Sequence, residues 1–254
     1  MTKIIINPEF EFLGDFLADL PHRFNSLGIL LHAHRNIIRE DTVKGVRLVV
    51  KSFKRIYLPN KIRYTYFYPS KAQRAYDNAH VLLSNGFNTP RPLAYLEIVK
   101  RGLIDEMFFV SEYTDFASLE KIHKDPAIAT PELLMAFAAF TFSLHRNNIY
   151  HVDYNLGNIL TNFVNGEYQF ALIDNNRMLF KSIGFNEGIG NFVRLGLSSD
   201  QLTIIGKEYA RLWKVDESIG IRLLFEKKLA QSRKFERNRS MKRALSIFRK
   251  QQQR

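Results

Sequence analysis

Residues 150–160, Tyr-His-Val-Asp-Tyr-Asn-Leu-Gly-Asn-Ile-Leu, hold a carboxylate and an amide at a fixed separation along the chain. Asp153 follows a histidine by two residues, and Asn158 follows Asp153 by five. A carboxylate can receive the proton of an attacking hydroxyl group, and an uncharged oxygen ligand can hold Mg²⁺ against phosphates. A second carboxylate for the metal, Asp174, ends the apolar run 170–173. The segment therefore contains the groups that phosphoryl transfer from ATP requires.

The spacing His-x-Asp, with Asn five positions later, is that of the catalytic loop of kinases. After the loop, Asn165-Gly166 predicts a tight hairpin turn between two β-rich runs, which places Asp174 at the end of the hairpin. We therefore expect Asp153 to be the catalytic base, and Asn158 and Asp174 to hold Mg²⁺. In the alternative interpretation, Asp153 and Asn158 are turn residues and Asp174 caps a loop.

The elements around this loop follow the order of a kinase small lobe and the start of its large lobe. Strands are expected at 36–39, 46–53, 93–99 and 106–113, with helices at 70–86 and 130–146. Ser70 and Gln73 form a capping-box pattern, and Thr130 caps the later helix. The first third otherwise reads as strands and turns. We predict an α+β, protein-kinase-like bilobal fold: a small β-rich N-lobe with one helix at 1–113, and a mainly helical C-lobe at 114–254.

In such a small lobe, one strand carries a lysine for the ATP phosphates. Lys51 fits because Val49, Lys51 and Phe53 fall on one face of the expected strand. Three nearby cations fit less well in register or flanking residues: Lys44, Arg47 and Lys54. We expect Lys51 to bind phosphate, and the alternative is a solvent-exposed lysine on an edge strand.

Composition limits the classes of protein to which the chain can belong. It has 254 residues, is 46% hydrophobic and contains no cysteine, so we expect a packed core without disulfides or cysteine-ligated metal. The apolar run at 1–8 is too short for a signal peptide, and no uninterrupted apolar run approaches about 18 residues. We predict a cytoplasmic protein without a membrane span.

The positive charge is concentrated at the C-terminal end. Glu226–Arg254 carries eleven Lys/Arg and two Glu, which gives +9 (11 − 2) of the net +12. Its apolar residues recur at helical spacing: Met241, Ala244, Leu245 and Phe248. One interpretation is a basic amphipathic helix that binds an anionic membrane surface, and the other is a solvated helix packed on its own domain. We expect no nucleic-acid partner, because no helix-turn-helix or aromatic RNA-binding motif accompanies the charge.

Taken together, these segments resemble the bacterial lipopolysaccharide core kinases, protein-kinase-like enzymes that phosphorylate Kdo or heptose sugars of the inner core. The resemblance extends over about residues 36–192. It rests on four segments: Lys51, Pro90-Arg91-Pro92-Leu93-Ala94, residues 151–160 and Ile173-Asp174-Asn175-Asn176-Arg177. Asn155 is typical of this family, and Asp-x-x-Arg at 174–177 replaces the Asp-Phe-Gly of protein kinases.

The resemblance implies an ATP-dependent kinase that phosphorylates a hydroxyl group of Kdo or heptose, with ATP and Mg²⁺ as cofactors. The family's pattern assigns to the site the residues Lys51, Asp153, Asn158 and Asp174. Glu112 and Tyr113 would meet the adenine through backbone groups of the interlobe connector. The implied partner is a lipid-linked saccharide, which places the enzyme in the cytoplasm and peripherally at the inner membrane.

Three features depart from the protein kinases. No glycine-rich loop is present, so cover for the phosphates is expected from backbone N–H groups of the turn at 42–45. No Ala-Pro-Glu segment follows Asp174, which argues against protein substrates. The acidic partner of Lys51 is missing from its expected place near Ala75, and Asp77 is rotated about 150° from the helix's apolar stripe.

Two other functions remain open. One is a kinase-like phosphotransferase for another small acceptor, such as an aminoglycoside or an amino alcohol. Such a site would be expected to show clustered acidic residues, which are sparse here. The other is a nucleotide-binding pseudokinase that scaffolds partners, which the missing partner of Lys51 favours and the presence of Asp153, Asn158 and Asp174 disfavours.

Overall fold

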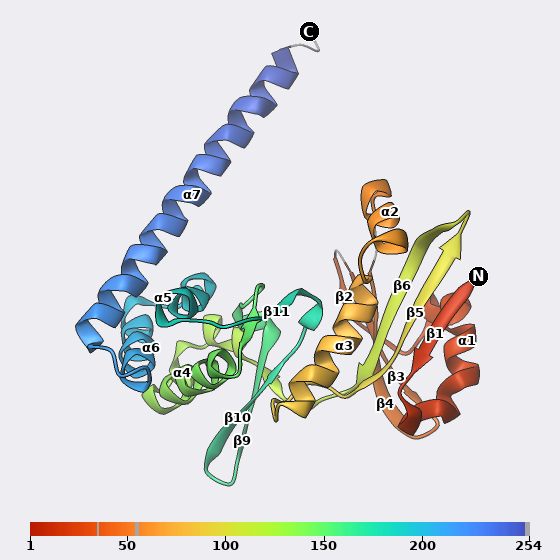
Figure 1. The fold of residues 1–254 in the computed structure, drawn as a ribbon, viewed down its shortest axis with the longest axis horizontal. Coiled ribbons are helices and arrows are strands. Elements are labelled where there is room, and N and C mark those ends of the chain that lie inside the picture. Colours follow the sequence, from red (N-terminus) through yellow and green to blue (C-terminus); the bar gives the residue numbers. More distant parts are fainter. Residues whose placement is uncertain (35, 54–55, 252–254) are drawn as a thin grey trace. The chain divides into compact units, whose positions relative to one another are not determined.

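The computed structural model describes residues 1–34, 36–53 and 56–251, except for the side chains of 238 and 242–251. Contacts divide the chain into two compact units (Figure 1). Unit 1 comprises Met1–Leu119 and Gly157–Met178, and unit 2 comprises Glu120–Leu156 and Leu179–Arg254. The hairpin that precedes Asp174 thus belongs to unit 1. The lobe boundary after Tyr113 stays a prediction.

Unit 1 is built on a six-stranded antiparallel sheet of order β1-β5-β6-β4-β3-β2. The strands are β1 (Thr2–Ile6), β2 (Ile29–Ala33), β3 (Ile37–Val43), β4 (Val46–Ser52), β5 (Pro92–Lys100) and β6 (Leu103–Glu112). The structure has β3 to β6 within a few residues of the four predicted strands. Lys44 and Gly45 join β3 to β4, and both have positive φ angles of 48° and 81°. Such a two-residue turn matches the twist of the paired strands.

Helices cover the two faces of this sheet. They are α1 (Gly14–Arg23), α2 (Leu58–Tyr66) and α3 (Lys71–Ser84), with short 3-10 turns η1 (Pro8–Leu13) and η2 (Phe24–Ser26). The prediction of strands and turns for the first third was wrong at α1 and α2. Leu13, Leu17 and Leu20 recur at helical spacing and pack with Leu48 of β4, which buries α1 on the sheet. Sequence inspection missed this stripe because Pro21 interrupts the helical pattern.

The predicted helix α3 packs on the opposite face. Ser70 accepts a hydrogen bond from the Gln73 backbone N–H at 3.0 Å, which caps the helix start as expected. Its buried residues are Ala72, Ala75, Tyr76, Ala79 and Leu82. Phe53 joins their cluster, and Lys51 Nζ lies 5.2 Å from the centroid of the Phe53 ring. Lys51 therefore lies on the α3 side of the sheet, whereas Leu48 and Val50 lie in the core on the α1 side.

A second sheet in unit 1 carries the predicted hairpin. Its strands are β7 (Ala117–Ser118), β9 (Ile159–Val164) and β10 (Glu167–Leu172), in the order β10-β9-β7. The turn is Asn165-Gly166, with φ angles of 52° and 84°. Asn and Gly are the residues that adopt these angles most readily. The turn chemistry thus confirms the predicted hairpin and places Asp174 two residues after β10.

Unit 2 is mainly helical. Its helices are α4 (Pro131–Arg146), α5 (Phe185–Gly188), α6 (Ser199–Leu212) and α7 (Glu217–Gln251), with 3-10 turns η3 (Leu119–His123), η4 (Pro126–Ile128) and η7 (Ile189–Arg194). Strands β8 (Ile149–His151) and β11 (Met178–Phe180) pair beside them. The predicted helix at 130–146 is α4, and Thr130 accepts from the Leu133 N–H at 3.3 Å.

Helix α7 extends well beyond α6 (Figure 1). Its bounds include most of the predicted basic helix, and Met241 is exposed. The rest of the predicted apolar stripe, Ala244, Leu245 and Phe248, lies outside the residues whose side chains are described. Among the residues that the structure describes, no helix combines the length and the hydrophobicity that crossing a bilayer requires.

A buried polar cluster joins α4, α6 and η7. His145 Nδ1 lies 2.7 Å from the hydroxyl oxygen of Tyr209, and His145 Nε2 lies 2.8 Å from Asn191 Oδ1. Gly188 packs directly against this pair. A Cβ atom at that position would lie 2.1 Å from the Tyr209 hydroxyl oxygen and 2.7 Å from His145 Nδ1. Only glycine fits without moving the pair.

We expect Gly188→Ala to lower the free energy of unfolding by about 2–4 kcal/mol, because the methyl group must displace a buried hydrogen bond or the backbone. Gly14→Ala is the matched control. Gly14 has helical φ and ψ of −50° and −49°, and its Cβ would meet only Ile6 Cδ1 at 4.0 Å. That variant should gain about 0.4–1 kcal/mol. Urea denaturation measures both, and equal unfolding free energies would contradict the packing argument.

Candidate active site

The centre of the site in unit 1 is an ion pair between Lys51 and Asp174. Lys51 Nζ lies 2.5 Å from Asp174 Oδ1, and the two side chains are 13% and 30% exposed. The strand β4 therefore delivers its lysine to the carboxylate that follows β10. Two of the four predicted site residues meet here.

Asp174 is held in an unusual backbone conformation. Its φ and ψ angles of 59° and 44° lie in the left-handed region, which costs about 1 kcal/mol or more for most residues other than glycine and asparagine. The side chain of Asn176 also donates to Asp174 Oδ1. One residue earlier, the N–H of Ile173 donates to the carbonyl of Asn158 at 3.0 Å. The backbones of Asn158 and Asp174, the two predicted metal ligands, are thereby brought close together.

Further hydrogen bonds fix the turn η6 (Asn175–Arg177) that follows Asp174. The side chain of Asn78 on α3 donates to the carbonyl of Asn175 at 2.7 Å. Asn175 Nδ2 donates to Thr89 Oγ1 at 2.8 Å, and Thr89 Oγ1 donates to the carbonyl of Leu172 at 2.7 Å. The position of Asp174 therefore depends on α3 and on the segment before β5.

The partner of Lys51 is thus Asp174, and α3 supplies no acid to it among the described contacts. Ala75 is buried against Phe53, in the place where an acidic residue was expected. Asp77 is exposed on another face of α3, and its charged neighbours include Lys3 and Glu97. The prediction that Asp77 is a poor partner for Lys51 agrees with this placement.

The turn at 42–45 does not cover the phosphate side of Lys51. This turn precedes β4, and Lys51 lies near the other end of that strand, opposite Ile38 of β3. Lys51 comes six residues after Gly45 along the strand, which is about 20 Å at 3.3 Å per residue. The prediction of phosphate cover from 42–45 was therefore wrong. Ile37, the first residue of β3, pairs with Ser52 and is thus the end of β3 near Lys51.

Lys71 is a site residue that sequence inspection missed. It is half-buried at the start of α3, and burial together with Arg74, Lys51 and Arg177 lowers its pKa, while Asp174 acts in the opposite direction. Lys71 therefore lies within electrostatic reach of Asp174 and of three other cations. Nothing in the local sequence distinguishes Lys71 from an ordinary solvated lysine in the first turn of a helix. The rival cations lie elsewhere: Lys44 Nζ donates to the Phe12 carbonyl at 2.6 Å, Arg47 stacks on Tyr113, and Lys54 lies outside the described residues.

Glu112 ends strand β6, and Tyr113 follows it. The N–H of Glu112 donates to the Arg91 carbonyl and the N–H of Tyr113 donates to the Arg47 carbonyl, both at 2.9 Å. The Glu112 carboxylate lies 3.5 Å from Arg91 Nε. Both N–H groups are therefore already occupied, so any contact of this segment with an adenine would have to use its carbonyl groups.

Asp153 belongs to unit 2, in the loop after β8. Its carbonyl accepts from Asn155 Nδ2 at 2.9 Å. The next residue, Tyr154, is buried, and its hydroxyl group lies 2.7 Å from Thr141 Oγ1 on α4. The loop is thus anchored on α4 beside Asp153. The meeting of Asp153 with Lys51, Asn158 and Asp174 stays a prediction.

Comparisons with known proteins place this geometry in a family. The model of the lipopolysaccharide kinase (Kdo/WaaP) family matches residues 40–215, more than half of the chain. The chain belongs to that family. No curated protein matches.

Solved structures resemble this kinase in fold. One is WaaP in complex with acyl carrier protein, with a TM-score of 0.59, 17% identity, and coverage of 90% of this chain and 98% of that chain. Another is the MAP kinase LmaMPK10 from Leishmania major, with a TM-score of 0.41, 13% identity, and coverage of 85% and 65%. The family match confirms the predicted family and the kinase activity, and the likeness to WaaP confirms the predicted kinase-like α+β fold.

In this lipopolysaccharide kinase, the loop that carries Asp153 rests on a neutral histidine. Asn191 Nδ2 donates to the carbonyl of His151 at 3.1 Å, so its oxygen faces His145 and accepts from Nε2. Nδ1 of His145 must then accept from the Tyr209 hydroxyl group. Burial lowers the pKa of His145 from 6.5 to about 4, although the hydrogen bond to Asn191 partly opposes this. The loop is thus held through a chain of neutral groups.

The pKa of His145 predicts a loss of stability in acid. The unfolded chain takes up a proton near pH 6.5, whereas the folded chain resists it until about pH 4. Stability from this group is therefore complete above pH 6.5 and falls by up to about 3 kcal/mol as the pH drops to 4. Urea denaturation at pH 7.5, 6 and 5 measures this slope. His145→Gln should flatten it and the exposed control His22→Gln should keep it, so an unchanged slope in His145→Gln would refute the assignment.

Proposed function

We propose that this kinase transfers the γ-phosphoryl group of ATP to a hydroxyl group of Kdo or heptose in the lipopolysaccharide inner core. The family supports the substrate class, and the ion pair between Lys51 and Asp174 supports ATP as the donor. Asp153 would accept the proton of the sugar hydroxyl group. The carrying observation is that two residues predicted for the phosphates from separate segments meet at 2.5 Å.

Lys51 and Asp174 would change partners when ATP binds. Lys51 would release Asp174 Oδ1 and donate to phosphate oxygens, which are stronger acceptors because they carry more charge. Asp174 would then present its carboxylate to the metal, while Asn176 keeps it oriented. The adenine would meet the carbonyl groups at Glu112 and Tyr113, because the N–H groups of these residues are already bonded.

The donor set around Asp174 fits Mg²⁺. This ion prefers oxygen ligands and is usually held by one or two carboxylates together with substrate phosphates. Asp174 and Asn158 supply one carboxylate and one amide oxygen. Within the described residues, no group of three or more His, Cys, Asp or Glu side chains could hold a metal, which agrees with a site completed by phosphates. When bound, Mg²⁺ would neutralise charge on the phosphates.

Lys71 would add a further charge to the triphosphate site. Its charged neighbours are Asp174 and the three cations Lys51, Arg74 and Arg177, and this excess of positive charge around Lys71 is unfavourable until an anion binds. The absence of an acid at Ala75 has the same consequence, since it leaves the α3 side of the site positive. We infer that these cations replace part of the cover that a glycine-rich loop gives in protein kinases.

Because its acceptor is lipid-linked, the enzyme would act at the cytoplasmic face of the inner membrane. Glu226–Arg254 would attract anionic lipid by about 1 kcal/mol per basic residue close to the surface. An acceptor such as an aminoglycoside is less well supported, because cations prevail around Asp174. A pseudokinase is also less well supported, since Lys51 has an acidic partner.

Asp153→Asn should lower kcat by a factor of about 10² to 10⁴, because the amide cannot accept the hydroxyl proton. The Kd for ATP should change less than about threefold, since the phosphate residues are untouched. Phosphate transfer from ATP to inner-core saccharide, read by mass spectrometry, measures the first quantity, and titration of ATP measures the second. Asp200→Asn, at an exposed carboxylate on α6, should behave as the wild type. Full turnover in Asp153→Asn would remove this residue from its role.

Lys71→Met should raise the KM for ATP by about tenfold or more, since it removes one charge-assisted contact to phosphate. Its melting temperature should hold or rise, because a half-buried cation among other cations is lost. Lys61→Met is the control, since Lys61 of α2 pairs with Asp105 of β6 and not with Asp174. A normal KM together with lower stability would assign Lys71 to packing alone.

A further inference from the structure

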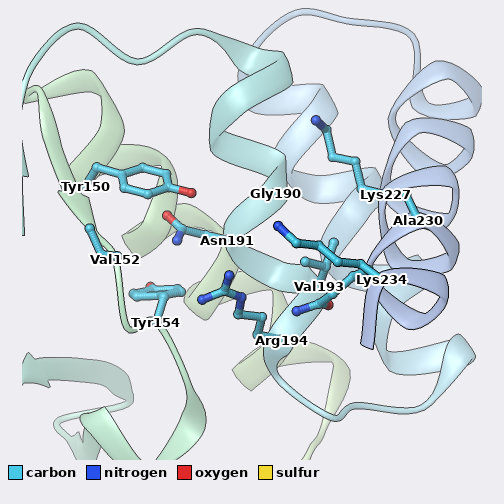
Figure 2. Close-up of a pocket in the computed structure, with 11 residues that line it drawn as sticks. Tyr150, Val152, Tyr154, Gly190, Asn191, Val193, Arg194, Lys227, Ala230 and Lys234 are labelled. Atoms are coloured by element: carbon cyan, nitrogen blue, oxygen red, sulfur yellow. The ribbon is translucent and has the colours of Figure 1, made fainter. Parts of the chain in front are cut away.

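A pocket of about 380 Å³ lies within unit 2, beside the catalytic loop (Figure 2). Val152 and Tyr154, the neighbours of Asp153 on either side, form part of its wall. The other walls come from η7 and from the start of α7. The volume is within the range of small-ligand sites. The pocket therefore adjoins the loop that carries Asp153, the proposed proton acceptor.

Cations dominate the lining of this pocket. Arg194 comes from η7, and Lys227 and Lys234 come from α7, whereas no carboxylate lines the pocket. Figure 2 shows Arg194 and Lys234 extending toward the space that the hydroxyl group of Tyr150 and the amide of Asn191 also face. Burial and nearby Glu187 raise the pKa of Tyr150, although Arg194 opposes them, so its hydroxyl group remains a donor at neutral pH.

The cations are positioned by the helix and not scattered along it. Lys227, Ala230, Gln231 and Lys234 stand at i, i+3, i+4 and i+7, which places all four on one face of α7. Exchanging the oxygen and nitrogen of the Gln231 amide satisfies both of its groups: the nitrogen then donates to the Val193 carbonyl at 3.0 Å and the oxygen accepts from Arg194 Nε at 3.1 Å. This bond directs the guanidinium group and leaves its terminal nitrogens for a ligand.

The acidic residue near this pocket is already neutralised. Glu187 lies 2.6 Å from Lys181 Nζ. In the part of the chain that the structure describes, no ion pair joins Arg194, Lys227 or Lys234 to a carboxylate. Like charges that converge in a concave site repel one another unless an anion binds between them. A merely solvated basic helix would not need a second element to contribute a cation to the same pocket.

We propose that this pocket binds an acidic group, a carboxylate or a phosphate monoester, carried by the acceptor saccharide. Arg194 would hold two oxygens of the group with its terminal nitrogens, Lys234 and Lys227 would supply charge, and Tyr150 would donate a further hydrogen bond. The inference rests on the proposed function, because it takes the ligand to be the acceptor saccharide. According to this proposal, residues in the first half of α7 help to determine which sugar lies over Asp153.

Arg194→Gln and Lys234→Gln test the pocket. Each should raise the KM for inner-core saccharide by about 10- to 100-fold, since each removes a charge-assisted contact. The KM for ATP should stay within about twofold. Arg233→Gln is the matched control, because this residue is on α7 but does not line the pocket, and it should behave as the wild type. Equal saccharide KM values in all three variants would overturn the proposal.

Two modified acceptors identify the group that binds. One has its carboxylates reduced to alcohols, and the other has its phosphate monoesters removed by a phosphatase. The modification that removes the bound group should raise the wild-type KM and abolish the difference between the wild type and Arg194→Gln. If that difference persists with both modified acceptors, no acidic group of the saccharide is bound there, and the proposal is wrong.

A binding measurement separates this proposal from the proposed function. Inner-core saccharide is titrated calorimetrically into Asp153→Asn protein, with and without Arg194→Gln. Weaker binding of at least tenfold in the double variant supports the pocket even if the wild type transfers no phosphate to this saccharide. Phosphate transfer by the wild type together with equal binding in both proteins would leave the function standing and overturn the pocket.

Discussion

The ion pair between Lys51 and Asp174 is the interaction on which the phosphate site depends. It joins residues 123 positions apart, and both charges are largely shielded from water. Leaving either charge without its partner would cost about 1–3 kcal/mol or more, so the strand β4 and the turn after β10 hold each other in place. In the proposed function the same pair opens when phosphates bind. Under that proposal, the site is ordered by a contact that its substrate replaces.

The catalytic loop in unit 2 is supported in a different way. Its anchors are uncharged: His145, Asn191, Tyr209 and the pair of Thr141 with Tyr154. Neutral hydrogen bonds inside a core respond little to ionic strength, whereas the charges of the phosphate site and of the Arg194 pocket respond strongly. Salt should therefore weaken substrate binding in this kinase well before it disturbs the loop. Low pH should have the opposite effect, because protonation of His145 weakens the hydrogen bonds that hold the loop and leaves the phosphate residues unchanged.

Much of this could be predicted from the sequence, because the relevant signals are local. The spacing of Asp153 and Asn158 lies within a few residues, Asn165-Gly166 specifies a hairpin by its own backbone preferences, and Ser70 marks the start of α3. Lys51 could be singled out because strand alternation fixes its face. These assignments required no knowledge of which elements lie next to one another.

What the sequence could not provide depends on contacts between distant segments. Asp174 as the partner of Lys51, Lys71 beside them, and Arg194 near the face of α7 each need the packed chain. The turn at 42–45 was assigned to the phosphates because it carries Gly45, yet the length of β4 separates it from Lys51. The helix α1 was missed because Pro21 obscures its apolar stripe.

The left-handed backbone at Asp174 has a consequence for how this enzyme could decay. Asparagine and glycine enter such a conformation at little cost, whereas alanine or a branched side chain is strained there. A duplicated copy released from selection that drifted to asparagine here would keep the backbone conformation of this turn, and it would lose the negative charge that pairs with Lys51. Inactive descendants of this kinase should therefore carry asparagine in place of Asp174, in a chain that is otherwise intact.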